Sequence, residues 1–231
     1  METLQKFSIP LSIIIAGALI AGGVMFGFKP ASRAPAGGDA AVQPNVDVND
    51  IKITASDPII GNPKAPLTLV YWFDYQCPFC KQFDQTSLQT LIKSYVDSGR
   101  LKIVLKDFAF LGEDSTVAAE YGHAVWEMYP DKYRKWHEAM FKAQDQEGDQ
   151  GFGDEPSILK LTGTIPGMDA GKLKALVAQK KKEYDAVASA NQQEAVKYGI
   201  QGTPGSVTGK QVISGAQPAE VFTAAIEAQL K

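Results

Sequence analysis

The chain has 231 residues, a formal net charge of −3, and a proportion of apolar and charged residues that is normal for a globular protein. This length allows one ordinary domain with appendages. The weakly acidic balance argues against a nucleic-acid-binding protein, which would carry a basic patch. The lysines at 180–182 are followed by Glu183 and Asp185, so we interpret them as one solvated face of a helix.

The N-terminal region begins with a short tail, residues 1–8, followed by residues 9–28, which contain no charged side chain. A helix of about twenty residues is about 30 Å long, which matches the hydrocarbon core of a bilayer. We therefore expect residues 9–28 to form an uncleaved transmembrane anchor. A cleaved secretory signal is one alternative, although the cleavage-like Ala34-Pro35-Ala36 lies well past the apolar core. A buried soluble helix is the other.

Residues 29–50 are rich in alanine, proline and glycine and contain almost no large apolar side chain. Such a segment cannot bury enough surface to fold, so we expect a flexible linker. A random coil of about twenty residues has a root-mean-square reach of about 25 Å, which would hold a domain near a membrane and let it turn. The globular domain is expected to occupy residues 51–231.

The globular part is expected to begin with a strand, a helix and a second strand. The apolar run at 67–73 predicts a strand buried on both faces. Apolar residues at helical spacing follow, and Gly99 ends that helix. Residues 100–108 alternate with period two and predict the second strand. This order implies a right-handed crossover between two parallel strands.

The rest of the domain is expected to be a block of helices followed by a short strand–strand–helix end. Helical patterns extend over residues 112–198, with a break at Pro130 and two further breaks at glycine-rich and proline-containing stretches. Residues 202–215 predict a hairpin, and residues 217–231 predict a last amphipathic helix. The predicted fold is therefore an α/β domain with a helical insertion.

Cys77 and Cys80 are the only cysteines, and both lie where the first strand gives way to the helix. Pro78 favours the first helical position, which puts Cys77 at the N-cap. Free N–H groups and the helix dipole then stabilise a thiolate at Cys77, so its pKa is expected to fall. Cys80 lies one turn further in and is expected to be more buried. An exposed, activated Cys77 and a resolving Cys80 form a redox pair.

A zinc site, a haem site and a structural disulfide each fit the cysteine pair less well. A zinc site needs four ligands, and His123 and His137, the only histidines, match no zinc-finger spacing. A c-type haem site needs a histidine after the second cysteine, where this chain has Lys81. A structural disulfide across so small a loop would add little stability. We therefore expect no metal and treat both histidines as ordinary helix residues.

Three stretches of the sequence resemble one known family: "FDYQCPFCKQF", the "GTP" at 202–204 and the "ISGAQPAEVF" near the C-terminus. They are similar to the DsbA family of thioredoxin-fold thiol–disulfide oxidoreductases, and most similar to its membrane-anchored bacterial members. The resemblance extends from about Ile59 to the C-terminus. It implies a thioredoxin-like fold in which the helical block at 112–198 is the family's helical insertion.

The resemblance implies roles for residues around the cysteines. Pro204 is expected to be cis and to lie beside the pair, which leaves the backbone of Thr203 free to pair with an extended substrate. Pro78 and Phe79 lie between the two cysteines and are expected to shape the active site. Phe79 cannot donate a hydrogen bond to Cys77 as a histidine could, so we expect a less extreme pKa shift than in the strongest oxidants of the family.

The chain also departs from the family pattern. Tyr71 stands where many members have a buried acid, six residues before the first cysteine. Asp74 is the nearest carboxylate and is a candidate proton relay for Cys80; a solvated aspartate at the end of a strand is the alternative. The segment after Pro204 has only Val207 as a large apolar residue, so we expect a weak or short strand there.

These features predict a thiol–disulfide oxidase that donates the Cys77–Cys80 disulfide to reduced or misoxidised client proteins and needs no cofactor. The resemblance implies that a membrane quinone-linked partner reoxidises the pair. Because such pairs work in oxidising compartments, we expect a single-pass membrane protein with its C-terminal domain outside the cytoplasm. A disulfide reductase or isomerase is one alternative function, and a non-catalytic peptide-binding module is another.

Overall fold

The computed structural model describes residues 46–145 and 151–230. The expected tail, membrane anchor and most of the linker, at residues 1–45, lie outside these residues. Within the described part of the chain, no helix has both the length and the apolar character needed to cross a membrane.

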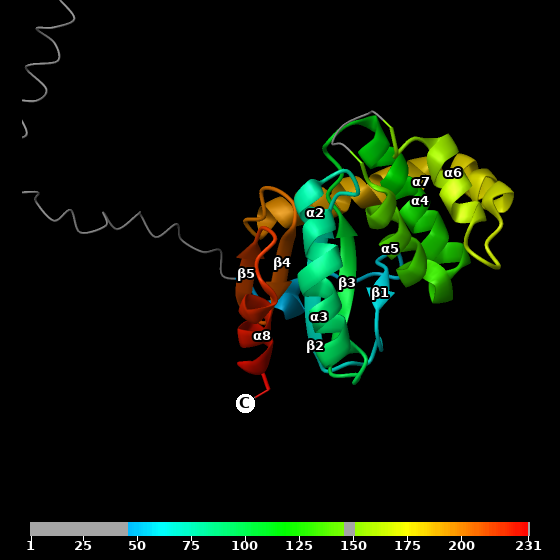
Figure 1. Ribbon diagram of the computed structural model, residues 1–231. Coiled ribbons are helices and arrows are strands. Elements are labelled where there is room, and N and C mark those ends of the chain that lie inside the picture. The colour runs from blue at the N-terminus through cyan, green and yellow to red at the C-terminus, as the bar shows by residue number, and fades with distance from the viewer. Residues whose placement is uncertain (1–45, 146–150, 231) are drawn as a thin grey trace, which may run out of the picture. The chain divides into compact units, whose positions relative to one another are not determined.

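The described residues form a five-stranded sheet in the order β1–β3–β2–β4–β5 (Figure 1). The central strands β2 (Leu67–Phe73) and β3 (Leu101–Asp107) pair in parallel, as the sequence predicts. On the other side of β2 lies the antiparallel hairpin of β4 (Gly205–Thr208) and β5 (Gln211–Ser214). The two-residue strand β1 (Ile59–Ile60) completes the edge beside β3.

The central strand β2 is buried on both faces, as its continuous apolar run predicts. Leu69, Tyr71 and Phe73 belong to one hydrophobic cluster, which also contains both cysteines. Val70 and Trp72 belong to a second cluster on the opposite face. Successive side chains of a strand point to opposite faces, so the two clusters are the two sides of one sheet.

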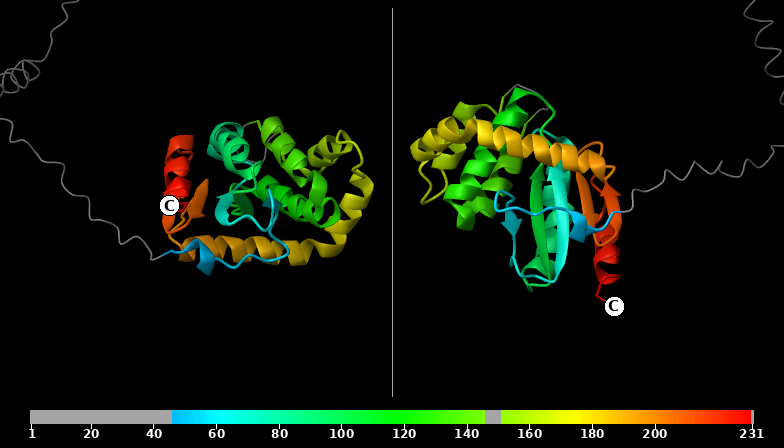
Figure 2. Two further views of the ribbon diagram at one scale, coloured as in Figure 1. Left: turned by 90° about the horizontal axis from the view of Figure 1, so that it is seen from below. Right: turned by 180° about the vertical axis from the view of Figure 1, so that it is seen from behind.

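Helices cover both faces of this sheet (Figure 2). The first face is covered by the helical segment that starts at Pro78 and by α8 (Ala219–Glu227), which contribute Phe83 and Phe222 to its cluster. The C-terminal end of the long helix α7 (Ala170–Lys197) covers the second face through Ala195.

The helical segment after the cysteine motif is continuous but not uniform. It consists of α2 (Pro78–Phe83), a π-helical turn (Asp84–Leu88), α3 (Gln89–Leu91) and a second π-helical turn (Ile92–Val96). Gly99 ends the segment in a left-handed conformation (φ 73°), which a glycine adopts without strain.

A block of helices separates β3 from β4, in the place that the sequence predicts. Four α-helices are described in this block, with a single 3₁₀ turn (Pro130–Lys132) before the second. They are α4 (Glu113–Met128), α5 (Tyr133–Ala143), α6 (Glu155–Gly163) and α7. The fold is therefore the expected mixed α/β domain with a helical insertion.

The expected start of the domain at residue 51 is too late. Val46 and Val48 are only 3% and 6% exposed and pack in the same cluster as Trp72. A 3₁₀ turn (Val48–Asp50) follows, and the Val48 N–H donates to the carbonyl of Gly209 at 2.7 Å. Residues 46–50 are thus part of the packed domain rather than of a flexible linker.

A buried lysine holds this N-terminal segment, the sheet and α7 together. Lys106 lies in β3, and its Nζ contacts Asp57 Oδ1 at 3.2 Å and Glu194 Oε2 at 2.9 Å. It also donates to the carbonyl of Lys52 at 3.0 Å and to Asn191 Oδ1 at 3.2 Å. The ammonium group on β3 is therefore surrounded by oxygen acceptors from two other parts of the chain, the N-terminal segment and α7.

Replacing Lys106 by methionine should destabilise the domain strongly. The Lys106→Met change leaves the carboxylate of Asp57 buried without its cation, and breaking a buried pair in this way costs about 3–5 kcal/mol. Urea denaturation would measure the loss in the free energy of unfolding. Lys102→Met, on the same strand but with an exposed ammonium on the Pro63 carbonyl, is the control and should change stability by less than about 0.5 kcal/mol. Equal losses in the two variants would contradict the assignment.

Candidate active site

The two cysteines lie on the first turn of α2, directly beyond the end of β2. Cys77 is the N-cap residue, with extended backbone angles (φ −79°, ψ 118°), and Pro78 takes the first helical position. The Cys77 N–H donates to the carbonyl of Asp74 at 3.1 Å, and the Lys81 N–H donates to the carbonyl of Cys77 at 3.1 Å. The turn from strand to helix is therefore closed by backbone hydrogen bonds. Both cysteines are free thiols.

Cys77 is the more acidic thiol. A hydrogen bond from the Cys80 thiol is the largest cause, and it lowers the pKa of Cys77 to about 6 against the opposing effect of burial. The side chain of Thr203 and the backbone N–H groups of Cys80 and Phe79 lower this pKa as well. These two N–H groups belong to the first turn of α2, where an N-cap group finds free donors.

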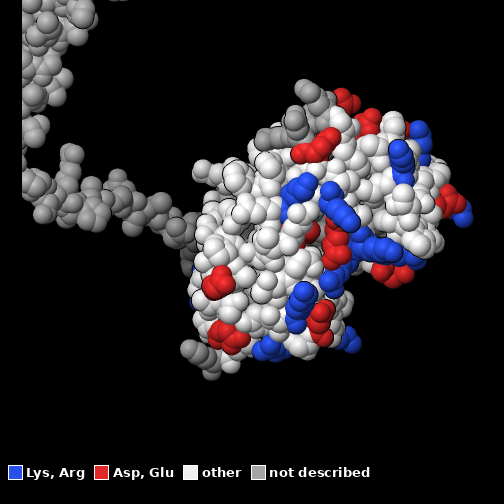
Figure 3. Space-filling model, viewed as in Figure 1, with Lys and Arg blue, Asp and Glu red and all other residues white. Residues whose placement is uncertain are grey.

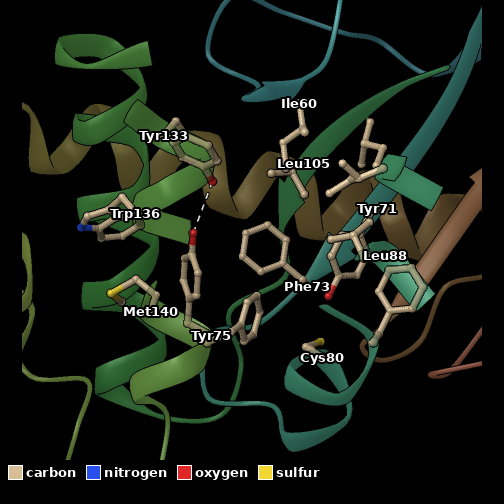
Figure 4. Close-up of a cluster of buried hydrophobic side chains, with 14 of the residues drawn as sticks. Ile60, Tyr71, Phe73, Tyr75, Cys80, Leu88, Leu105, Tyr133, Trp136 and Met140 are labelled. Carbon is tan, nitrogen blue, oxygen red and sulfur yellow. Dashed lines mark hydrogen bonds between the residues drawn. The ribbon is translucent and has the colours of Figure 1, made fainter. Parts of the chain in front are cut away.

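Cys80 has the opposite environment. It is fully buried among the aromatic side chains beneath β2 (Figure 4). Burial is the largest cause that raises the pKa of Cys80 well above its ordinary value, and its hydrogen bond to Cys77 raises it further. At neutral pH, the charge of the reduced pair therefore lies on Cys77.

Cys77 is less exposed than the sequence suggested. Its exposed fraction is only 4%, and the open residue of the motif is Phe79, at 61%. The chain segment that approaches Cys77 comes from far along the sequence: the Cys77 Sγ lies 3.4 Å from the carbonyl oxygen of Thr203. Little of the Cys77 sulfur is therefore open to a partner, and Phe79 is the exposed apolar side chain next to it.

The Thr203–Pro204 peptide bond is cis, as the resemblance implies, and it precedes β4. Gly205 follows, and a Cβ atom there would lie 2.4 Å from the Ile200 side chain, so glycine is needed for this close approach. β4 is short, as expected, but its four residues are fully enclosed, and Val207 is 0% exposed. The loop is thus held against Cys77 by a strand in the interior of the sheet.

Asp74 is not a solvated residue at the end of a strand; the structure contradicts that alternative. It is 2% exposed, and its carboxylate accepts hydrogen bonds from the N–H groups of Gln76, Phe110 and Leu111 and from the Ser115 hydroxyl, at 2.7–3.2 Å. Burial is the largest effect on its pKa and raises it, although all four hydrogen bonds oppose the rise. Its carboxylate ties the end of β2 to the loop after β3, and a role in proton transfer stays a prediction.

Gln144 is a site residue that the sequence did not indicate. It lies at the end of α5, and its side-chain nitrogen donates to the carbonyls of Tyr75 at 2.6 Å and Cys77 at 3.0 Å. The ammonium of Lys81 in turn donates to the backbone carbonyl of Gln144. Gln76 makes a similar link to the carbonyl of Phe152 at 2.9 Å. No local pattern signals these contacts, because the partners are far apart in sequence.

The two histidines are buried and form pairs with carboxylates. His137 Nε2 lies 3.2 Å from Asp84 Oδ2, and its Nδ1 contacts the Tyr75 hydroxyl at 2.9 Å. His123 Nε2 lies 2.7 Å from Asp107 Oδ2. Within residues 46–145 and 151–230, no group of three or more histidine, cysteine or acidic side chains could hold a metal ion. Each histidine thus contacts a different carboxylate.

Comparison with known proteins assigns the chain to a family. Residues 54–228 match a family model described as thioredoxin, so the chain belongs to this thioredoxin family. Among curated relatives, it is similar to the probable disulfide bond formation protein D of Bacillus anthracis, with 24% identity over 156 residues, 68% of this chain and 71% of the relative.

Solved structures extend the likeness. The crystal structure of oxidised BdbD from Bacillus subtilis has a TM-score of 0.68 and 26% identity, and the alignment covers 76% of this chain and 93% of that one. DsbA from Chlamydia trachomatis shares the fold, with a TM-score of 0.67 and 19% identity over 78% of this chain and 94% of that one. The resemblance to the DsbA family and the thioredoxin-like fold are confirmed.

The reduced protein should ionise at Cys77 near pH 6. Thiolate absorbance at 240 nm should rise with a midpoint at about that pH and should disappear in Cys77→Ser. The folded state lowers this pKa below the unfolded value of about 8.5. The Cys77 thiolate therefore contributes its full stabilisation to the reduced fold above about pH 8.5. This contribution should be lost as the pH falls from about 8.5 through about 6. Urea denaturation should therefore show that the free energy of unfolding of the reduced form decreases over this pH range relative to that of Cys77→Ser. A midpoint near the unfolded value would contradict the site geometry.

Proposed function

We propose that the protein is a thiol–disulfide oxidase that passes the Cys77–Cys80 disulfide to reduced client proteins. The single observation that carries this proposal is the difference between the two sulfurs. The pKa of Cys77 is lowered to about 6, whereas burial raises the pKa of Cys80. A fold that stabilises a thiolate in the reduced pair makes its disulfide easier to reduce, and therefore more oxidising.

The exchange follows from these positions. A client thiolate attacks the Cys77 Sγ of the disulfide, the Cys77–Cys80 bond breaks, and its electron pair stays on Cys80. A second client thiolate then attacks the client sulfur of the mixed disulfide and expels Cys77 as a thiolate. The client is oxidised by two electrons, the protein pair is reduced, and the two client protons balance the reaction. The low pKa of Cys77 makes it a good leaving group in the second step.

The surface around the motif suits an unfolded client. Phe79 is 61% exposed beside Cys77 and offers an apolar contact. In Figure 3 the charged side chains lie over α3, the helical insertion and α8, while the surface over β5 and the start of α2 is largely uncharged. Unfolded chains present apolar side chains and free backbone groups. The backbone of Thr203, beside Cys77, is the group we propose to pair with such a chain.

The relatives support the same activity, since one is named as a probable disulfide bond formation protein. We extend the proposal to the cellular setting: the uncharged segment at 9–28 anchors the protein, its C-terminal domain lies outside the cytoplasm, and a membrane quinone-linked partner reoxidises the pair. Alkaline carbonate extraction should leave the full chain in the membrane pellet and release a chain lacking residues 1–45. Release of both forms would contradict the anchor.

Trapping should reveal the clients. In Cys80→Ser, the Cys77 thiolate can still attack a disulfide of an oxidised client, and Cys80 is no longer present to resolve the mixed disulfide, so client proteins should accumulate as adducts on non-reducing gels. Cys77→Ser, which keeps the buried thiol, is the matched control and should trap nothing. Absence of adducts in Cys80→Ser would refute the proposal. A domain that only binds peptides would retain its partners when both cysteines are serine.

The reduction potential should distinguish oxidation from reduction. Equilibration with glutathione should give a value nearer the DsbA figure of about −120 mV than the thioredoxin figure of about −270 mV. Because Phe79 donates no side-chain hydrogen bond to Cys77, we expect the value to lie short of the most oxidising extreme. A value close to that of thioredoxin would favour the reductase alternative.

A further inference from the structure

A buried hydroxyl beside Cys80 has no part in the exchange described above. Tyr71 lies in the middle of β2, is 0% exposed, and packs its ring against Phe73 and Phe83 with centroids 5.4 and 4.9 Å apart. Its hydroxyl points toward the sulfur of Cys80 (Figure 4). In the part of the chain that the structure describes, the hydroxyl has no hydrogen-bond partner of ordinary geometry, but the Cys80 thiol lies close enough to it to raise the pKa of Tyr71. A buried polar group of this kind requires a physical reason.

The surroundings of Tyr71 allow it to give a hydrogen bond but not to accept a proton from Cys80. Burial is the largest cause that raises the pKa of Tyr71 well above its ordinary value, and the charges on Cys80 and Asp84 raise it further. The phenol therefore keeps its proton throughout the neutral range. A neutral phenol facing a sulfur acts as an O–H donor.

The exchange reaction creates a need for such a donor. When a client thiolate attacks Cys77, the departing electron pair arrives on the Cys80 sulfur. That sulfur is 0% exposed, so water cannot stabilise the new charge. A buried charge without a hydrogen-bonding partner is strongly disfavoured. Breaking the disulfide would therefore be slow unless a donor were already in place beside Cys80.

We propose that Tyr71 is this donor: its hydroxyl gives a hydrogen bond to the Cys80 thiolate as that thiolate leaves Cys77. The Tyr71 proton stays on oxygen throughout. The Cys80 sulfur afterwards takes a proton released by the client thiols, and the resulting thiol turns its hydrogen toward Cys77. In the reverse direction, the same hydroxyl stabilises Cys80 as it loses its proton and attacks the mixed disulfide. Tyr71 thus contacts a reacting atom in both directions.

Other groups face the same sulfur, and their positions leave this role to Tyr71. The Thr203 side chain and a backbone group of Asp74 also favour the Cys80 thiolate. Thr203 is shared with Cys77, whose pKa it lowers. Asp84, a buried acid at the start of the π-helical turn after α2, lies 3.2 Å from His137 and would repel a thiolate rather than stabilise it. The Thr203 hydroxyl is shared between the two sulfurs, whereas the uncharged Tyr71 hydroxyl interacts by hydrogen bonding with Cys80 and not with Cys77.

The test compares Tyr71→Phe with wild type in the reaction of the oxidised protein with reduced glutathione. Acid quenching and mass spectrometry would measure how fast the mixed disulfide forms at Cys77. We expect the rate to fall by about tenfold, the effect of losing one hydrogen bond to a charged group. Tyr133→Phe is the matched control, because Tyr133 is equally buried and its hydroxyl contacts only Tyr75, at 3.3 Å, within the described residues. Its rate should not change.

A second measurement separates this role from a structural one. In a Cys77→Ala background, Cys80 is the only thiol, and the pH dependence of its ¹³Cβ chemical shift reports its ionisation without a reagent having to reach the buried sulfur. Adding Tyr71→Phe should move this midpoint to higher pH, whereas adding Tyr133→Phe should not. If Tyr71→Phe fails to fold, 3-fluorotyrosine at position 71 decides instead: it keeps the ring, makes the hydroxyl a stronger donor and should speed the glutathione reaction.

The role rests on the proposed exchange at Cys77, and the two can fail separately. If wild type does not react with glutathione, the exchange itself is refuted and the role of Tyr71 with it. If wild type reacts but Tyr71→Phe keeps both its rate and the Cys80 midpoint, only the role of Tyr71 is overturned. Equal slowing in Tyr133→Phe would overturn it as well, because the effect would then belong to the aromatic core in general.

Discussion

Placing one sulfur inside the core and the other at its edge is the constraint on which the site depends. The first turn of α2 separates Cys77 from Cys80 by three residues, yet this short distance crosses from a helix N-terminus to the layer beneath β2. Free N–H groups stabilise charge at the first position, and burial opposes it at the second. The reduced pair therefore has one preferred place for its negative charge. An open helix start without the aromatic layer above Cys80 would leave the two thiols much more alike.

That difference survives only if the turn is held in place, and the helical insertion contributes to holding it. Gln144, at the end of α5, donates to carbonyls on both sides of the turn, while the carboxylate of Asp74 fixes the loop after β3. The carbonyl of Thr203 approaches Cys77 from a third direction. Each contact joins segments that are distant in sequence. The insertion is thus part of the active site's support, because a looser turn would let water reach Cys80 and weaken the asymmetry.

The local features of the fold were predictable from sequence, and the long-range ones were not. The apolar run of β2, the helix start at Pro78 and the stop at Gly99 are encoded by residues within a few positions of one another. The burial of Asp74 depends on donors 36 to 41 residues away, which no periodicity reveals. The enclosed state of Cys77 has the same cause. The domain start was predicted too late for a different reason. Val46 and Val48 are isolated valines in a segment rich in alanine, proline and glycine, so its composition indicates a linker although both valines pack in the core.

Several buried polar atoms of the described core have no hydrogen-bond partner, and a buried polar atom without a partner lowers the stability of a fold. Several of them belong to buried ion pairs and still face a charged partner, namely those of His123, Glu194 and the His137–Asp84 pair. Around the cysteine turn the others are Tyr71 Oη, Gln76 Oε1, Gln144 Oε1 and Thr203 Oγ1, of which only the two hydroxyls can donate. A core selected for stability alone would pair or remove such atoms. A site in which charge moves from one sulfur to the other has a different requirement, since donors that serve the second charge state stay idle in the first. On this argument, the idle hydroxyl of Tyr71 in the reduced pair is the counterpart of a bond that it makes when Cys80 carries the charge.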